Sequence, residues 1–308
     1  DDYPFRAAGE IDRIHENLLF YNEHTFGASE SIRNPFCENS EVQWAEKGSY
    51  VWEALKSAQI MYEAAAGRLQ GSLYRADRPT LTFFNSMART RSGLVKVYID
   101  YELVPRDMNF SIVDENGRKL RWQPLNSRKE GRYYAIYAED IPAMGYRTYE
   151  LVVEEGGQPQ GQSENVSGKT PVVENAFYRL ECDPSRGGLA SVIDKETGAE
   201  LLDKNAEWNA GEVIYESLEG DRRQMERKVF EKYSREGMTD VRFSRIQKGA
   251  VYTSVFCHGK LRGCSDSGVN VEVRLFNDVK RIEFSYSLSR LPETDPSGIY
   301  VAFPFSVP

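Results

Sequence analysis

Cysteine is scarce in this chain of 308 residues, and its four cysteines show no C-x-x-C spacing. They are Cys37, Cys182, Cys257 and Cys264. Four cysteines in a chain of this size are too few for a disulfide framework, so we expect free and mostly buried thiols. Only Cys257 and Cys264 are close enough in sequence for a hairpin bridge, which we do not expect to form.

Long apolar runs and an excess of basic residues are also missing. No run reaches transmembrane length, and no signal-peptide pattern opens the chain. The net charge of −8 argues against a nucleic acid as the main partner, because phosphate binding needs clustered Lys and Arg. We therefore expect a soluble chain that has neither a nucleic acid nor a membrane as a partner. The sequence does not decide between cytoplasm and periplasm.

Both ends of the chain look cut. It begins without Met at DDYPF and stops at YVAFPFSVP, inside an apolar run typical of a strand. Natural termini are rarely so apolar. We expect a fragment of a longer protein, and localisation signals could lie outside it.

The composition is that of a globular protein, with 40% hydrophobic and 28% charged residues. A chain of 308 residues exceeds one ordinary core, so two or three domains are expected. We predict a partial helical bundle over 1–76, a small β-sandwich over 77–155, a linker over 156–171 and a large antiparallel β-sandwich over 172–308, truncated at its C-terminus. The predicted fold class is multidomain and mainly β.

Helical periodicity is confined to the first part of the chain. Apolar residues from Ile11 to Tyr21 predict a helix over 5–21. Ser40 followed by Gln43 has the pattern of a capping box and predicts a second helix that runs to about Leu69. We interpret its apolar stripe as a bundle core rather than a ligand groove: Val51, Leu55, Ala58, Tyr62, Ala65 and Leu69.

From Pro79 the repeat of the apolar residues changes from 3.6 residues, typical of a helix, to two residues, typical of a strand. The strand-like runs are short, β-branched and aromatic, and turn residues separate them. The stretch 174–203 predicts a three-stranded meander with reversals at Gly187-Gly188 and at Gly198, and such a unit needs a second sheet to cover it. VNVEVRLF, 269–276, alternates clearly. The charged stretch 219–240 is interpreted as a solvated helix or mobile loop.

One segment, NEHTFGASESI at 22–32, gathers residues that suggest chemistry. His24 stands beside Glu23 among small residues, as a zinc ligand or half of an acid–base pair would. One histidine cannot make a zinc site; His15 lies nine residues earlier and His258 in another domain. From the residues alone, a hydrogen-bonded structural histidine is the commoner alternative.

Several segments together resemble the α-mannosidases of glycoside hydrolase family 38, in the region that follows their catalytic barrel. ENAFYRLECDPSRGGLASVIDKETGAELLD resembles the opening of the family's large mutarotase-like β-domain, and LTFFNSMARTRSG and IPAMGYRTYEL resemble the start and end of its smaller one. YVAFPF resembles a strand that the family continues. The resemblance implies a partial middle helical domain, a small β-sandwich and a galactose-mutarotase-like supersandwich.

The resemblance also implies a role for one residue. LLFYNEHTFGASESI is similar to the segment in which a histidine completes a zinc site with one histidine and two aspartates of the barrel, and that histidine falls on His24. Phe26 stands where bacterial members commonly have Trp. The family's retaining mechanism uses two carboxyl groups of the barrel. The chain alone is therefore expected to have no catalytic residue, to retain no zinc and to be inactive.

Two functions follow from this reading. In the first, the chain supplies scaffold and one metal ligand to a zinc-dependent α-mannosidase-like hydrolase, whose partners are the missing barrel of the same polypeptide and an α-mannoside or related glycan. In the second, the aromatic-rich β-domains form a non-catalytic carbohydrate-binding or scaffolding module.

Overall fold

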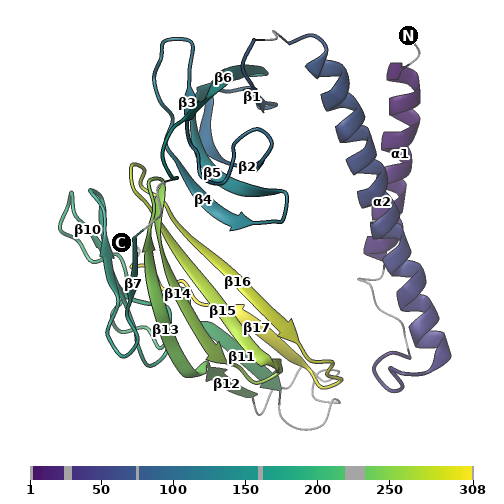
Figure 1. Ribbon diagram of the computed structural model, residues 1–308. Coiled ribbons are helices and arrows are strands. Elements are labelled where there is room, and N and C mark those ends of the chain that lie inside the picture. Colours follow the sequence, from purple (N-terminus) through teal and green to yellow (C-terminus); the bar gives the residue numbers. More distant parts are fainter. Residues whose placement is uncertain (1–2, 24–29, 74–75, 159–161, 219–232, 307–308) are drawn as a thin grey trace. The chain divides into compact units, whose positions relative to one another are not determined.

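The computed structural model describes residues 3–23, 30–73, 76–158, 162–218 and 233–306, and these fall into two units, 1–75 and 76–308 (Figure 1). The first unit is helical and the second is built from antiparallel sheets. This arrangement confirms the predicted mainly β, multidomain fold class. In the described ranges, neither helix combines the length and apolar content needed to cross a bilayer.

The helical unit consists of α1 (Tyr3–Asn22) and α2 (Glu38–Gln70), close to the two predicted helices. The predicted capping box is wrong, because α2 begins after Cys37 and not after Ser40. Ser40 lies inside the first turn and is fully buried, and its hydroxyl donates to the carbonyl oxygen of Asn34 at 3.2 Å. The side chain therefore holds the preceding loop instead of capping the helix.

The face of α2 that meets α1 also differs from the predicted stripe. Tyr50 stacks on Phe20 of α1 with ring centroids 5.5 Å apart, and Ala54, one turn further along α2, is buried. Leu55 and Tyr62 of the predicted stripe are instead exposed, at 56% and 74%. The stripe is therefore not the core of this two-helix unit, because the residues that face α1 lie on a neighbouring face of α2.

A small β-sandwich follows, made of two three-stranded sheets with orders β1-β6-β3 and β2-β5-β4. Its strands are β1 (Thr80–Asn85), β2 (Arg91–Asp100), β3 (Asn109–Val113), β4 (Trp122–Ser127), β5 (Gly131–Ile141) and β6 (Gly145–Glu154). Phe110 stacks on Trp122 at 4.1 Å, and Tyr134 meets both rings edge-on. These three aromatic side chains fill the space between the sheets, as alternation in the strands predicts.

The large β-region contains the remaining strands, in sheets with orders β10-β9-β8, β12-β11-β17 and β16-β15-β14-β13-β7. They are β7 (Gln162–Asn165), β8 (Val172–Glu174), β9 (Tyr178–Cys182), β10 (Leu189–Asp194), β11 (Val213–Leu218), β12 (Tyr233–Gly237), β13 (Thr239–Lys248), β14 (Tyr252–Lys260), β15 (Cys264–Phe276), β16 (Ile282–Arg290) and β17 (Ser297–Val301). Strand β7 lies within the predicted linker and pairs with β13. The division at 156–171 stays a prediction. In the stretch 219–240, predicted as a helix or mobile loop, residues 233–237 form β12 and β13 begins at Thr239, so the prediction is wrong there; residues 219–232 lie outside the described ranges.

The predicted meander is correct in two of its three strands. β9 and β10 pair antiparallel, and Gly187, Gly188 and Gly198 have positive φ as the turns require. The third strand of this sheet is β8, which precedes β9, whereas residues 200–203 make only isolated bridges. The VVE segment pairs with the edge of β9 that faces away from β10, while Glu200 makes one bridge to Ile193 of β10.

Strand β15 separates an apolar face from a polar one. Val269, Val271, Val273 and Leu275 are all buried in the core of the large β-region, as the alternation predicts. Cys182, Cys257 and Cys264 are buried free thiols, which confirms the prediction for them. Burial raises the pKa of the Cys182 and Cys257 thiols to about 12, so both are inert at neutral pH.

The two β parts meet where β4 of the small sandwich reaches the turn between β13 and β14. The side-chain oxygen of Gln123 accepts hydrogen bonds from the backbone N–H groups of Val251, at 2.9 Å, and Tyr252, at 3.0 Å. Gly249 makes this approach possible, because a Cβ there would lie 2.1 Å from the same oxygen. Apolar contacts among Ala135, Tyr252 and Phe276 complete the junction.

We predict that Gly249→Ala lowers the free energy of unfolding by about 1–3 kcal/mol, because the added methyl group displaces Gln123 from the turn. Gly157→Ala, where a Cβ meets no atom within 4 Å, should change it by less than about 0.5 kcal/mol. The measurement is the urea midpoint at unchanged m value. In a Gln123→Ala background the cost of Gly249→Ala should largely vanish. An equal cost in both backgrounds would show that the clash does not involve Gln123.

Candidate functional site

His24 lies outside the described residues, so its surroundings stay a prediction. Its neighbour Glu23 is described, and its carboxylate lies 3.7 Å from the ammonium group of Lys47 on α2. His15 is exposed on α1, and Nδ1 of His258 lies 3.2 Å from the side-chain oxygen of Asn270. Within the described ranges, no three His, Cys, Asp or Glu side chains gather as metal ligands would. The described residues therefore do not fit a zinc ion by themselves.

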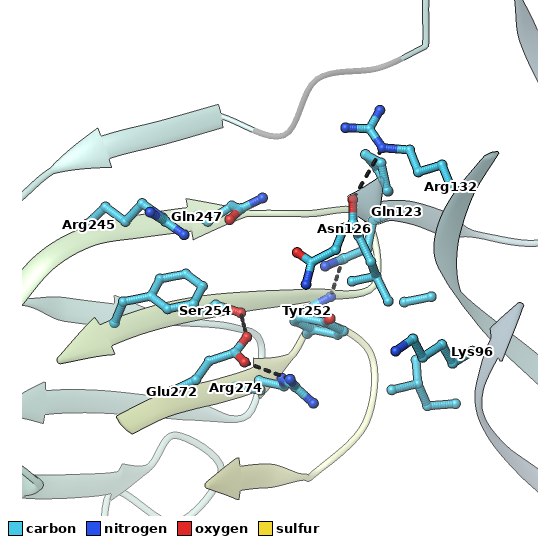
Figure 2. A pocket seen from close by; sticks show the side chains of 15 residues that line it. Lys96, Gln123, Asn126, Arg132, Arg245, Gln247, Tyr252, Ser254, Glu272 and Arg274 are labelled. Atoms are coloured by element: carbon cyan, nitrogen blue, oxygen red, sulfur yellow. Dashed lines mark hydrogen bonds and ion pairs between the residues drawn. The ribbon is translucent and has the colours of Figure 1, made fainter. Parts of the chain in front are cut away.

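A cleft of about 560 Å³ lies between the small sandwich and the five-stranded sheet (Figure 2). It is lined by Leu94, Lys96, Gln123, Pro124, Leu125, Asn126, Arg132, Ala135, Arg245, Gln247, Tyr252, Ser254, Phe256, Glu272 and Arg274. Its size falls in the range of small-molecule binding sites. We refer to this space as the cleft.

One wall of the cleft is the polar face of the five-stranded sheet. Ser254 and Phe256 of β14 lie opposite Arg274 and Glu272 of β15, and Arg245 of β13 lies opposite Phe256. Because side chains on a strand alternate between faces, these residues point away from the buried valines of β15. The same backbone pairing that builds the core therefore also builds this wall.

The other wall comes from the small sandwich. Figure 2 shows Lys96, Asn126 and Arg132 on the strands opposite the sheet, with Tyr252 between the two sides. Arg132 donates to the carbonyl oxygen of Leu125 at 3.2 Å and to the side-chain oxygen of Gln158 at 3.3 Å. Lys96 places its ammonium group 4.3 Å from the centroid of the Tyr133 ring. Both cations thus contact neutral groups.

Glu272 is the carboxylate of the cleft, and its partners hold it ionised. Ser254 donates to it at 2.7 Å and Arg274 at 2.6 Å. Burial raises the pKa of the Glu272 carboxyl, but these hydrogen bonds and the charges of Arg274 and Arg245 outweigh burial, so the pKa lies below its ordinary value. The same contact raises the pKa of Arg274. Glu272 is therefore a hydrogen-bond acceptor at neutral pH and not a proton donor.

A second depression, of about 350 Å³, shares Arg245, Phe256 and Glu272 with the cleft and extends to His258 and Asn270. The polar face therefore offers an elongated surface. Sequence reasoning missed this surface, although the polar residues that alternate with the valines of 269–276 were its signal. What the strand pattern could not predict is that the small sandwich covers one end of it.

We predict that Glu272 makes the stability of the protein depend on pH. Its folded-state pKa is lowered, so its contribution is complete above the unfolded pKa, near 4.5, and is lost as the pH falls through the folded value. The urea midpoint should fall more between about pH 5 and pH 3 in the native protein than in Glu272→Gln. Glu164→Gln changes an exposed residue on β7, and its urea midpoint should depend on pH as that of the native protein does. Parallel curves for native protein and Glu272→Gln would contradict the assignment.

Residues 173–307 match the model of the glycosyl hydrolases family 38 C-terminal domain. Among solved structures, the fold is similar to that of an alpha-mannosidase from Enterococcus faecalis V583, with a TM-score of 0.51 and 10% identity. The match covers 85% of this chain and 35% of that one, so the chain spans about a third of the length of the solved protein. Among curated proteins, no relative is found.

The family match lies on β8–β17, and the structural match extends over most of the chain. At 10% identity the structural similarity shows the fold alone, and the family match is to residues 173–307. Residues 173–307 are therefore similar to the C-terminal domain of glycosyl hydrolases family 38, and the fold of most of the chain is similar to part of an alpha-mannosidase.

Proposed function

We propose that the chain is the part of a zinc-dependent, retaining α-mannosidase-like hydrolase that follows the catalytic barrel, and that it supplies scaffold and one metal ligand to an active site in that barrel. The observation that carries the proposal is the family match over residues 173–307. The fold shared with an alpha-mannosidase supports it. The substrate would be an α-mannoside or a related glycan.

In this proposal His24 binds zinc through one imidazole nitrogen, and the remaining ligands come from beyond the described residues. A zinc ion that keeps open positions can hold sugar hydroxyls and orient the ring. Lys47, paired with Glu23, ties the residue just before His24 to α2. The contribution of this chain is thus to position one ligand, and both carboxyl groups of a retaining hydrolase would lie in the barrel.

A second function is favoured by the cleft of Figure 2. A non-catalytic carbohydrate-binding module needs a concave, polar surface on a rigid sheet, and the cleft between the two β parts has these properties. The two functions differ in what they require of His24. A binding module does not need this histidine, whereas the hydrolase does.

The test is His24→Ala in the full-length protein that contains this chain and the barrel. We expect bound zinc, measured by metal analysis, to fall well below one equivalent. Hydrolysis of an aryl α-mannoside should fall by more than about 100-fold, because even the outer partners of metal ligands are worth 10–100-fold. His15→Ala, an exposed change on α1, is the matched control and should leave both unchanged.

Zinc and activity that both survive His24→Ala would overturn the site assignment while leaving the family match in place. The isolated 308-residue chain should not hydrolyse the same mannoside. Measurable turnover by the isolated chain would overturn the proposal that the catalytic groups lie elsewhere.

A further inference from the structure

The cleft concentrates positive charge in an acidic protein. Lys96, Arg132, Arg245 and Arg274 line it against one carboxylate, Glu272, although the chain as a whole carries a net charge of −8. Arg274 is paired with Glu272, but the other three cations have no carboxylate in ion-pair contact among the described residues and so favour a bound anion. The charge distribution therefore favours an anionic ligand.

Most of the donors in the cleft are free to bind such a ligand. The guanidinium group of Arg245 lies 4.3 Å from the centroid of the Phe256 ring, and no ion pair or hydrogen bond holds it within the described part of the chain. Arg132 contacts only neutral oxygens and Lys96 an aromatic ring. Among the four cations, Arg274 is the one with carboxylate partners in the described residues, Glu272 at 2.6 Å and Glu283 at 3.8 Å. A carboxylate or phosphate group can thus form charge-assisted hydrogen bonds without breaking an existing ion pair.

The uncharged groups of the cleft indicate what carries the anion. The side-chain amides of Asn126 and Gln247 come from opposite walls and have no hydrogen-bond partner among the described residues. Each offers one acceptor and two donors, and the fixed Glu272 carboxylate adds acceptors, which is the mixture that sugar hydroxyls need. An inorganic anion would contact the cations alone and would form no hydrogen bonds that require these amide and carboxylate acceptors.

From these observations we propose that the cleft binds an acidic saccharide, a sugar that carries a carboxylate or phosphate group. Arg245 binds the anionic group, Lys96 on the opposite wall adds positive charge, and Asn126, Gln247 and Glu272 bind the hydroxyls. The adjoining depression towards His258 and Asn270 extends the site along the sheet, which suits more than one sugar unit. The inference uses only residues of the second unit and does not depend on the proposed zinc site.

The test is calorimetric titration of the 308-residue chain with digalacturonate and with its methyl ester, which has the same shape without the charge. Digalacturonate should bind at least about tenfold more tightly than the ester, and less tightly as salt is added. Glucose 6-phosphate and inorganic phosphate form the second pair. Tighter binding of glucose 6-phosphate than of digalacturonate identifies the anion as a phosphate.

Variants on the two walls locate the site. Arg245→Gln and Asn126→Ala should each weaken binding of the preferred acidic sugar, Arg245→Gln by about tenfold or more, because a charge-assisted hydrogen bond is lost. Arg242→Gln removes the same charge from an exposed position on the same strand, outside the cleft, and should leave binding unchanged. Unchanged urea midpoints would show that all three variants fold.

Three results would overturn the inference. Binding of digalacturonate no tighter than its ester, together with binding of glucose 6-phosphate no tighter than inorganic phosphate, would show that the cleft does not select an anionic sugar. If inorganic phosphate binds as tightly as glucose 6-phosphate and digalacturonate does not bind, the cleft recognises an anion and not a sugar. Equal losses in Arg245→Gln and Arg242→Gln would indicate a general effect of protein charge. None of these results bears on His24 or zinc.

Discussion

The side-chain oxygen of Gln123 accepts two backbone hydrogen bonds from the turn between β13 and β14, and the position of the small sandwich on the large β-region depends on this contact. The turn has N–H groups that need acceptors, and Gln123 is the buried side chain that satisfies Val251 and Tyr252. Gly249 leaves the space for it. Together with the apolar contacts of Ala135, Tyr252 and Phe276, this junction holds the strands that carry Lys96 and Arg132 opposite the sheet that carries Arg245.

The second constraint is the two-residue period of the strands in the five-stranded sheet. The residues of β15 that build the core and those that line the cleft alternate along one backbone, so Val271 and Val273 cannot be buried without presenting Glu272 and Arg274 to the other side. Stability and the candidate binding surface therefore share one register. A slip by one residue would bury an ion pair and expose the core.

The helical unit illustrates a different situation. Leu55 and Tyr62 of α2 are exposed although they lie on a regular apolar stripe, while Ala54 on the neighbouring face is buried. Periodicity predicts that a helix has an apolar side, but it does not specify the partner that covers that side. The same reasoning explains why Ser40 was misread as a cap: its hydroxyl found an acceptor in Asn34, across a loop that local pattern rules do not describe.

The sequence by itself determined the mainly β class, the two helices, the turns at Gly187, Gly188 and Gly198 and the buried face of β15, because each depends on local periodicity or on a backbone angle that few residues adopt. It also pointed to His24, through resemblance rather than geometry. Only the tertiary structure decided that Arg245, Asn126 and Lys96 line one cavity, because they lie on strands far apart in the chain, and their proximity follows from the contact between Gln123 and a distant turn.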